Sequence, residues 1–292
     1  MKRMSESRVA IVVVNYQGWQ NCQQCLQSLC RLNYRNFFVV VVANEAPTAP
    51  PPPFPEVLNV TMLPNPENRG FAAACNQGIR AAAPLEPEFV WLLNNDAAAE
   101  PGALACLVAE AQADSRIGAV GSVLLNGDDS HPTQVWGGGV VSGMSGLPRH
   151  LTLFSSSPPQ YICGASVLLR RRALDEIGCL DEGYFMYWED TELSFRLRQN
   201  GWKLAVAERS RVTHFGDFSS RFQSEFFDYH FTASSVRFFR QYYRFWPFPV
   251  GVSVAGRCFR RVAAGKWGNA LAALSGCRDS ICRRRFGNPH RA

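Results

Sequence analysis

The run Val9-Ala-Ile-Val-Val-Val-Asn15 decides the fold class of this chain. A continuous apolar run that stops at a polar residue is typical of a strand covered on both faces. Two later runs repeat the pattern: Phe37-Phe-Val-Val-Val-Val42 stops at Ala43-Asn44, and Phe89-Val-Trp-Leu-Leu93 stops at Asn94-Asn95-Asp96. Strands of this kind form parallel sheets between helices. The sequence therefore predicts an α/β protein with a single, mostly parallel sheet.

Helical periodicity appears between these runs, for example in the alanine-rich segment from Gly70 to Ala83, which Pro84 ends. Ligands of such sheets bind beyond the carboxyl ends of the strands. Asn15, Asn44 and Asp96 stand at those ends. We therefore expect these polar residues to line a binding site.

The composition is that of a folded chain, with 292 residues, of which 47% are hydrophobic and 18% charged. This length suits one large domain with an appendage. Several of the 10 cysteines lie in apolar segments, which indicates free thiols in a reducing compartment. The apolar runs Val9 to Val14 and Phe245 to Gly256 are too short to span a membrane. We therefore expect a cytoplasmic protein.

Positive charge is concentrated towards the C-terminus. From Arg237 onward there are 12 Arg and Lys and one acidic residue, whereas the preceding residues carry 18 basic and 23 acidic side chains. Phe, Tyr and Arg also become frequent there, in a pattern that predicts a helix from Arg221 to Trp246. The glycine-rich segment Gly137 to Gly146 reads as a loop. We predict a catalytic domain over residues 1–220 and a helical, Arg-rich extension over 221–292.

The segment Asn94-Asn95-Asp96 places a carboxylate at the end of a buried strand. Transfer of a sugar from a nucleotide diphosphate needs a divalent cation to hold the leaving group. Mg²⁺ and Mn²⁺ prefer carboxylate oxygens and keep several waters, so one or two protein ligands suffice. His214, after a short predicted strand, could share Mn²⁺ with Asp96. The plainer alternatives are a polar loop and a structural histidine.

The segment Phe185-Met-Tyr-Trp-Glu189-Asp190 joins an aromatic loop to an acidic pair, and a helical pattern follows. Asp190 could cap that helix. It could equally act as a general base, because attack by a sugar hydroxyl requires removal of its proton. The aromatic residues, Trp188 among them, could form a stacking wall for a sugar.

Six segments, taken in order, carry a resemblance: Val13-Val-Asn15-Tyr-Gln-Gly-Trp19, Glu67-Asn-Arg-Gly-Phe-Ala-Ala-Ala-Cys-Asn76-Gln-Gly-Ile79, Trp91-Leu-Leu-Asn-Asn-Asp96, Cys163-Gly-Ala-Ser166, Leu180-Asp-Glu-Gly-Tyr-Phe-Met-Tyr-Trp-Glu-Asp190 and His214. In this order and spacing they resemble the family 2 glycosyltransferases, and most of all the bacterial rhamnosyltransferase-like branch. The resemblance covers residues 8 to 220 and is weaker beyond them.

This resemblance implies the glycosyltransferase A fold, a Rossmann-like sheet with flanking helices. It also implies an inverting transfer of a sugar, with rhamnose one candidate, from a nucleotide diphosphate sugar to an acceptor hydroxyl in glycan or cell-surface polysaccharide synthesis. By position, Asp96 would bind the divalent cation (Mg²⁺ or Mn²⁺) with His214 as a further contact, and Asp190 would be the base, with Glu189 second. The residues expected around the donor and its sugar are Asn15, Tyr16, Asn44, Arg69, Asn76, Asn94, Asn95 and Trp188.

The end of the second strand departs from the family pattern. That strand usually ends in Asp-Asn, where the Asp meets the pyrimidine base, but here it ends in Ala43-Asn44. Asn44 could replace the missing carboxylate. The departure leaves open a homologue that binds nucleotide sugars with weak or lost turnover. A nucleotidyltransferase is disfavoured, because Asn15 to Trp19 has no basic residue to form a phosphate loop, and an adaptor acting through its C-terminal extension is a third alternative.

The family also implies a glycan or lipid-linked glycan acceptor, and we expect no nucleic-acid partner. Arg237, Arg240 and Arg244 fall on one side of the predicted helix, with aromatic residues between them. Basic, aromatic helices bind anionic membrane surfaces. We therefore expect the protein to lie peripherally on the inner face of a membrane. The rival expectation is that these aromatic residues pack on the catalytic domain.

Overall fold

The computed structural model describes residues 6–47, 50–126, 133–135, 137–151, 158–215 and 224–282. It divides into two compact units. The first, here called the sheet unit, comprises residues 1–140, 150–181 and 190–216. The second, the helical unit, comprises residues 141–149, 182–189 and 217–292. The predicted boundary at residue 220 lies outside the described residues, and the two internal segments of the helical unit were not predicted.

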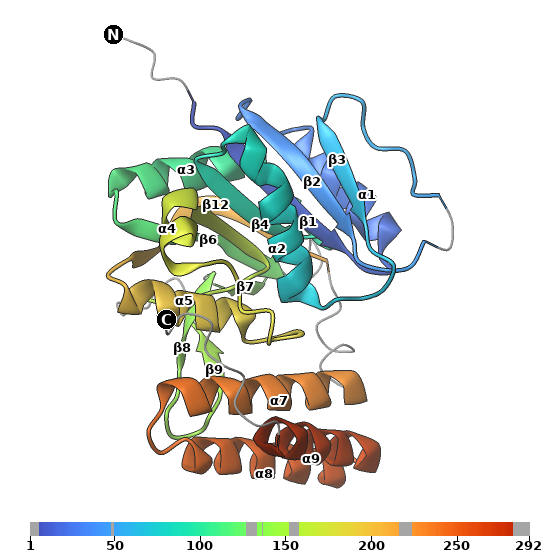
Figure 1. Cartoon of the computed structure of the whole chain (residues 1–292), viewed down its shortest axis with the longest axis vertical. Helices are drawn as coiled ribbons and strands as arrows, with labels where there is room; N and C mark the ends of the chain where they lie inside the picture. The colour runs from blue at the N-terminus through green and yellow to red at the C-terminus, as the bar shows by residue number, and fades with distance from the viewer. Residues whose placement is uncertain are drawn as a thin grey trace. The chain divides into compact units, whose positions relative to one another are not determined.

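The sheet unit contains a nine-stranded sheet with the path β3-β2-β1-β4-β11-β6-β12-β5 and with β7 paired to β6 (Figure 1). Its strands are β1 (Val9–Asn15), β2 (Phe37–Ala43), β3 (Val60–Pro64), β4 (Phe89–Asn94), β5 (Ala97–Ala99), β6 (Ile117–Asn126), β7 (Thr133–Val135), β11 (Ser166–Arg170) and β12 (Lys203–His214).

The three apolar runs form the parallel part of this sheet, as predicted. β1 pairs in parallel with β2 and β4, and β2 with β3. β11 is inserted antiparallel between β4 and β6, and β6 then pairs in parallel with β12. Strands β1, β2, β3, β4, β6 and β12 therefore run in one direction, so the sheet is mostly parallel.

Helices cover both faces of the sheet. Successive residues of β1 point to opposite faces, so they pack against different helices. Ile11 and Val13 join one core cluster with residues of α1 and α3, whereas Val12 and Val14 join another with residues of α2, α4 and α5. Cys22 lies in the first cluster, where burial raises the pKa of its thiol to about 12. The helices are α1 (Trp19–Leu29), α2 (Phe71–Ala82), the 3-10 turn η1 (Ala83–Leu85), α3 (Ala103–Ala113), α4 (Arg171–Ile177) and α5 (Glu189–Gln199).

The glycine-rich segment that we expected to be a loop forms part of a second sheet. Its three short strands, β8 (Gly138–Val141), β9 (Pro148–His150) and β10 (Tyr161–Ile162), have the order β10-β8-β9. A Cβ atom added at Gly138 would lie 2.8 Å from the carbonyl oxygen of Tyr161. The glycine therefore permits close strand approach here, and composition alone wrongly indicated a loop.

The helical unit is built from α7 (Glu225–Tyr242), α8 (Pro247–Ala263) and α9 (Trp267–Cys282). α7 starts at a side-chain cap, in which Ser224 Oγ accepts a hydrogen bond of 3.1 Å from the amide of Phe227. It ends four residues before the predicted limit of Trp246. Pro247 opens α8, because the first helical position tolerates proline. No helix in the described part of the chain is both long and apolar enough to cross a membrane.

Candidate active site

The carboxyl ends of β1, β2 and β4 are joined by polar side chains. The buried Asn15 Oδ1 accepts a hydrogen bond of 2.9 Å from Asn95 Nδ2. Asn15 Nδ2 donates at 3.4 Å to Glu45 Oε1, and Glu45 Oε2 accepts from the amide of Gln17 at 2.9 Å. The sheet edge therefore carries a connected polar surface, beside which Tyr16 is exposed.

Asn44 belongs to the scaffold of this surface. Its Oδ1 accepts from Asn65 Nδ2 at 3.0 Å and from the amide of Arg69 at 3.1 Å, and its Nδ2 donates to Asn68 Oδ1 at 2.9 Å. These bonds fix the loop before α2 and leave the Arg69 side chain exposed. Asn44 therefore positions Arg69, while its own amide group is engaged within the protein.

Asp96 and His214 come together from sequence positions 118 residues apart, because β5 pairs with the end of β12 and sets His214 opposite Ala97. Asp96 is fully buried, and its Oδ1 lies 3.1 Å from His214 Nε2. Asn94 Nδ2 lies 3.2 Å from the same nitrogen. The imidazole therefore either accepts from Asn94 or, when protonated, donates to Asp96.

This pair fits the predicted cation site in its chemistry. Within the described residues no group of three or more His, Cys, Asp or Glu gathers. A carboxylate and an imidazole are nevertheless sufficient protein ligands for Mn²⁺ or Mg²⁺, because these ions complete their coordination with water and substrate phosphates.

Asp190 lies in the first turn of α5, which begins at Glu189, so it does not precede the helix as a cap would. Its Oδ2 accepts a hydrogen bond of 2.8 Å from the amide of Gly164, and its Oδ1 accepts one of 2.6 Å from the amide of Thr191. Burial raises the pKa of Asp190, and these hydrogen bonds act in the opposite direction. A raised pKa suits a proton acceptor.

A dipeptide connects the Asp190 carboxylate to the segment that carries Asp96, the predicted cation ligand paired with His214. The Ala165 carbonyl oxygen accepts from the amide of Asn94 at 3.0 Å, and the amide of Gly164 donates to Asp190. The Gly164-Ala165 backbone thus joins Asp190 to the segment that carries Asp96. That Asp190, Asp96 and His214 act together stays a prediction, which this backbone link supports.

The turn before α5 adopts an unusual backbone conformation. Tyr187 and Trp188 have φ values of 67° and 69°, which cost non-glycine residues energy. Rings of α7 hold the turn: Tyr187 packs on Phe227 at 5.0 Å between centroids, and Trp188 packs on Phe238 at 5.0 Å. Trp188 is buried in this cluster. It offers no open stacking face, so the expectation that it lines the sugar site is not supported.

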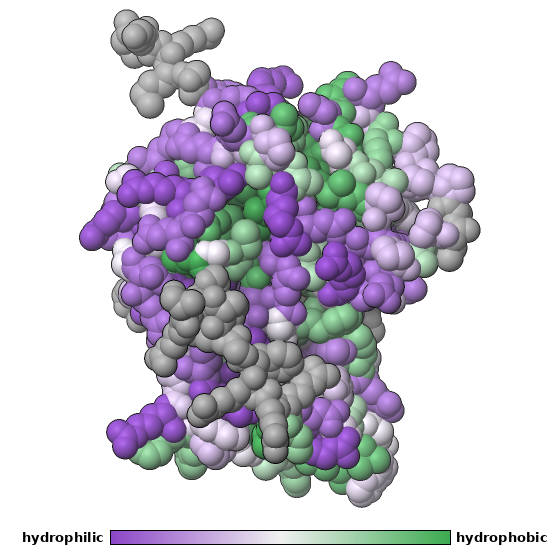
Figure 2. Space-filling model, in the orientation of Figure 1, coloured by the Kyte–Doolittle hydropathy of each residue, from purple (hydrophilic) through white to green (hydrophobic). Residues whose placement is uncertain are grey.

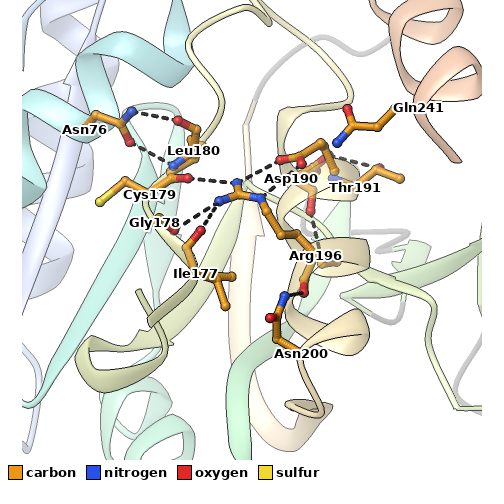
Figure 3. A network of polar contacts seen from close by, with 12 residues as sticks. Asn76, Ile177, Gly178, Cys179, Leu180, Asp190, Thr191, Arg196, Asn200 and Gln241 are labelled. Atoms are coloured by element: carbon orange, nitrogen blue, oxygen red, sulfur yellow. Dashed lines mark hydrogen bonds and ion pairs between the residues drawn. The ribbon is translucent and has the colours of Figure 1, made fainter. Parts of the chain in front are cut away.

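A polar network fixes α5 behind the site (Figure 3). Both amide atoms of Asn76 bond the backbone of Leu180, at 2.8 and 3.0 Å. Arg196 pairs with the buried Glu192 at 2.8 Å and donates to the carbonyl groups of Ile177 and Cys179. Asn76 was expected beside the nucleotide, but its contacts give it a positioning role.

Sequence reasoning missed four contributors to this site. Gly164 stands in one of the six quoted segments but was given no role there, and the other three stand in none of them. They are Glu45, Gly164, Arg196 and His150, whose Nδ1 lies 3.3 Å from the hydroxyl of Tyr161. Burial lowers the pKa of His150 and the charge of Asp190 raises it, so the two groups interact.

Comparison with known proteins places this chain in a family. The model for "Glycosyltransferase like family 2" matches residues 7–243. An N-acetylglucosaminyl-diphospho-decaprenol L-rhamnosyltransferase of Mycobacterium tuberculosis is 29% identical over 180 residues, or 53% of this chain and 59% of that protein. The O-antigen biosynthesis protein RfbC of Myxococcus xanthus is 31% identical over 156 residues, or 48% of this chain and 12% of that protein. The chain thus spans less than two thirds of the length of these relatives.

Solved structures share the fold. The crystal structure of GalNAc-T7 with UDP, GalNAc and Mn²⁺ has a TM-score of 0.65 and 17% identity, covering 94% of this chain and 55% of the other. The mannosyltransferase PcManGT from Pyrobaculum calidifontis, in complex with GDP-Man and Mn²⁺, has a TM-score of 0.59 and 15% identity, covering 95% and 81%. The predicted glycosyltransferase A-like fold is confirmed. Together with the family match, it follows that the chain belongs to the family 2 glycosyltransferases, in their bacterial rhamnosyltransferase-like branch.

Proposed function

We propose that this protein is an inverting glycosyltransferase that moves a sugar from a nucleotide diphosphate sugar to an acceptor hydroxyl. The observation that carries the proposal is the Asp96–His214 pair at the end of the sheet, which the Gly164-Ala165 backbone links to Asp190. Membership of the family supports it. So do two neighbours of the same fold, whose structures contain a nucleotide or nucleotide sugar together with Mn²⁺.

In this proposal Asp96 and His214 would hold a divalent cation, which would supply positive charge to offset that of the leaving diphosphate. Arg69, which the loop exposes at the sheet edge, is the protein cation available to the same phosphates. Asn15 and Asn95, bonded to each other, provide the polar surface against which the donor lies.

The chemical step that we propose is one displacement. The acceptor oxygen attacks the anomeric carbon while Asp190 takes its proton. The bond from that carbon to the diphosphate oxygen breaks, and the diphosphate leaves with the electron pair. A single displacement inverts the configuration at the anomeric carbon. Burial assists Asp190, because a carboxylate with a raised pKa holds the proton more strongly.

Glu45 offers an answer to the missing carboxylate at Ala43. Glu45 lies two residues further along, and it bonds the side chain of Asn15 and the backbone of Gln17. We propose that Glu45, rather than Asn44, supplies the carboxylate that meets the nucleotide base. With Glu45 in that role, the missing carboxylate at Ala43 would no longer be a reason to favour a homologue without turnover.

The name of the mycobacterial relative suggests the remaining substrates. That protein is named as transferring L-rhamnose to an N-acetylglucosaminyl-diphospho-decaprenol. We accordingly propose a deoxyhexose such as rhamnose as the donor sugar and a lipid-linked glycan as the acceptor, with action at the inner face of a membrane.

A thermal-shift screen of nucleotide sugars, with and without Mn²⁺, tests the proposal. A ligand at 100 times its Kd stabilises the folded state by about 2.7 kcal/mol. We expect one donor to raise the Tm only when Mn²⁺ is present, and product analysis to show the opposite anomeric configuration. Binding without transfer or hydrolysis would favour the inactive homologue. Absence of any stabilising donor would contradict the proposal.

A further inference from the structure

The helical unit exposes two apolar helix faces that the fold leaves uncovered. On α8, Phe248, Val252 and Phe259 recur at helical spacing and are 62%, 44% and 76% exposed. On α9, Trp267, Leu271 and Leu274 do the same, at 63%, 63% and 50%. Such large side chains, in series on adjacent helices, mark an interaction surface. We call these six residues the apolar face.

The opposite sides of both helices are buried within the unit. Val250 and Val254 of α8 and Ala270 and Ala273 of α9 are buried, and both helices pack against α7 and against each other. The apolar face therefore lies on the side of α8 and α9 opposite to these buried residues. Figure 1 shows the three helices of the unit. Figure 2 shows hydrophobic residues at the surface of this unit beside strongly hydrophilic ones.

Positive charge predominates around this face. From Tyr229 to Arg278 the sequence contains eight Arg and Lys and no Asp or Glu. Arg257 and Arg261 turn inward to the buried Asp228, at 2.8 Å each, and Arg278 pairs with Asp279 at 3.0 Å. Exposed Arg244 and Arg260 flank the apolar residues of α8. The surface thus combines exposed apolar side chains with exposed arginines.

Two aromatic residues that the sequence suggested for a membrane surface are not available to one. Phe238 and Phe239, which interleave with the arginines of α7, are fully buried, and Trp188 packs on them. Arg237 lies over the ring of Tyr184 at 5.2 Å. Phe238 and Phe239 are therefore core residues. Arg283 to Arg285, the third basic cluster of the sequence, lie outside the described residues.

We propose that the apolar face of α8 and α9 inserts into the interface of an anionic lipid bilayer. Amphipathic helices with aromatic residues on one side and basic residues beside them lie in the membrane plane, with the apolar side among the headgroups and acyl chains. Phe and Trp contribute the insertion, and Arg244 and Arg260 contact the anionic headgroups. The proposal is independent of catalysis, because it concerns binding that needs neither donor nor acceptor.

Surface substitutions test this better than truncation, because removing α7 would also remove the rings that hold the turn at Tyr187 and Trp188. The test variant carries Phe248→Ser, Phe259→Ser and Trp267→Ser. The matched control carries Val57→Ser and Leu85→Ser, which replace exposed apolar residues of the sheet unit. A second variant carries Arg244→Gln and Arg260→Gln. Circular dichroism and Tm measurements are used to check that all three variants remain folded.

The assay is sedimentation of the full chain with vesicles of phosphatidylcholine, with and without phosphatidylglycerol. We expect binding to the anionic vesicles only, weakened by salt. The aromatic variant should bind at least ~10-fold more weakly, because insertion of a single Phe side chain already contributes about this factor. The arginine variant should lose about fivefold per charge, and the control should bind as the wild type does.

Three results would overturn the proposal. The first is equal recovery of the wild type in the supernatant with and without anionic lipid. The second is an aromatic variant that binds as well as the control. The third is sedimentation equilibrium showing a dimer that only the aromatic variant dissociates, because the face would then be an interface between two copies of the chain.

Discussion

Asp96 and Asp228 are two fully buried aspartates in environments of opposite character. Asp228, in α7, is surrounded by permanent donors: Arg257 and Arg261 at 2.8 Å each and Asn269 Nδ2 at 2.7 Å. Asp96 has His214 beside it, with Nε2 at 3.1 Å from Oδ1. Two arginines compensate the first charge within the protein, whereas we propose that a bound cation meets the second. Burial of a carboxylate alone therefore says little about function, and the nature of its partners says more.

The largest effect should come from Asp96→Ala. We expect loss of at least ~10³-fold in transfer, since a metal contributes several kcal/mol to such a transition state. The Tm should change less than for Asp228→Ala, because Asp96 follows the end of β4 and is not held by a pair of arginines as Asp228 is. Radiolabelled-donor transfer and calorimetry measure the two quantities. Substantial activity in Mn²⁺ would remove the contrast between the two aspartates.

Asp228→Ala is the complementary variant. It leaves Arg257 and Arg261 without their carboxylate, and loss of one partner of a buried ion pair costs about 3–5 kcal/mol. We expect this loss in the free energy of unfolding, measured with urea. The kcat of the protein that remains folded should be close to that of the wild type. A stable but inactive Asp228→Ala variant would show that Asp228 serves the reaction.

Asp190→Asn tests the proposed base, whose role differs from those of Asp96 and Asp228. The amide cannot accept the proton, so turnover should fall at least ~10²-fold, the lower range for loss of a general base. Donor binding with Mn²⁺ should persist, which thermal shift can measure. The control is Glu189→Gln, one residue earlier, which should cost less. If Glu189→Gln is the more damaging change, the base is Glu189.

The pH dependence of kcat/KM should report the ionisation of the Asp190 carboxylate. Burial raises the pKa of Asp190 above its ordinary value of 3.8. Because only the ionised form accepts a proton, kcat/KM should fall with decreasing pH at a point above 3.8. Between 3.8 and the raised value the folded state binds more protons than the unfolded state, so this group's contribution to stability decreases as pH rises. An acid limb at or below the ordinary value would contradict the assignment.

The smallest effect concerns Glu45, a partly exposed carboxylate at the same edge of the sheet. Glu45→Gln should weaken donor binding by about 1 kcal/mol, the size of one good hydrogen bond. Ala43→Asp in that background should restore the affinity for a uridine or thymidine donor. Isothermal titration measures both. If Glu45→Gln binds normally while Ala43→Asp tightens binding, the base carboxylate is missing in this chain.

The sequence predicted the parallel strands β1, β2 and β4, since each is a continuous apolar run that needs no partner to be recognised. It did not predict β11 between β4 and β6, because that antiparallel insertion depends on packing between distant segments. The same holds for residues 182–189, which join the helical unit through rings of α7.

The candidate site divides in a similar way. Asp96 and Asp190 were predicted because motifs contain them, whereas the backbone link between their segments is seen only in the fold. Gly164 acts through its backbone amide and Arg196 through carbonyl groups on another segment. Such roles leave no spacing in the sequence. Asn76 and Trp188 were over-interpreted for the converse reason, since a motif position does not say whether a side chain faces a ligand or the core.

The Gly164-Ala165 dipeptide has a consequence for how this protein can evolve. One of its peptide groups orients the base, and its next carbonyl anchors the strand that ends at Asn94. A side chain at residue 164 would begin 3.3 Å from the Asp190 Cβ and displace it. If Asp190 is the base, as we propose, this tight fit leaves its position little room to vary, and new sugar or acceptor preferences would arise in the surrounding loops.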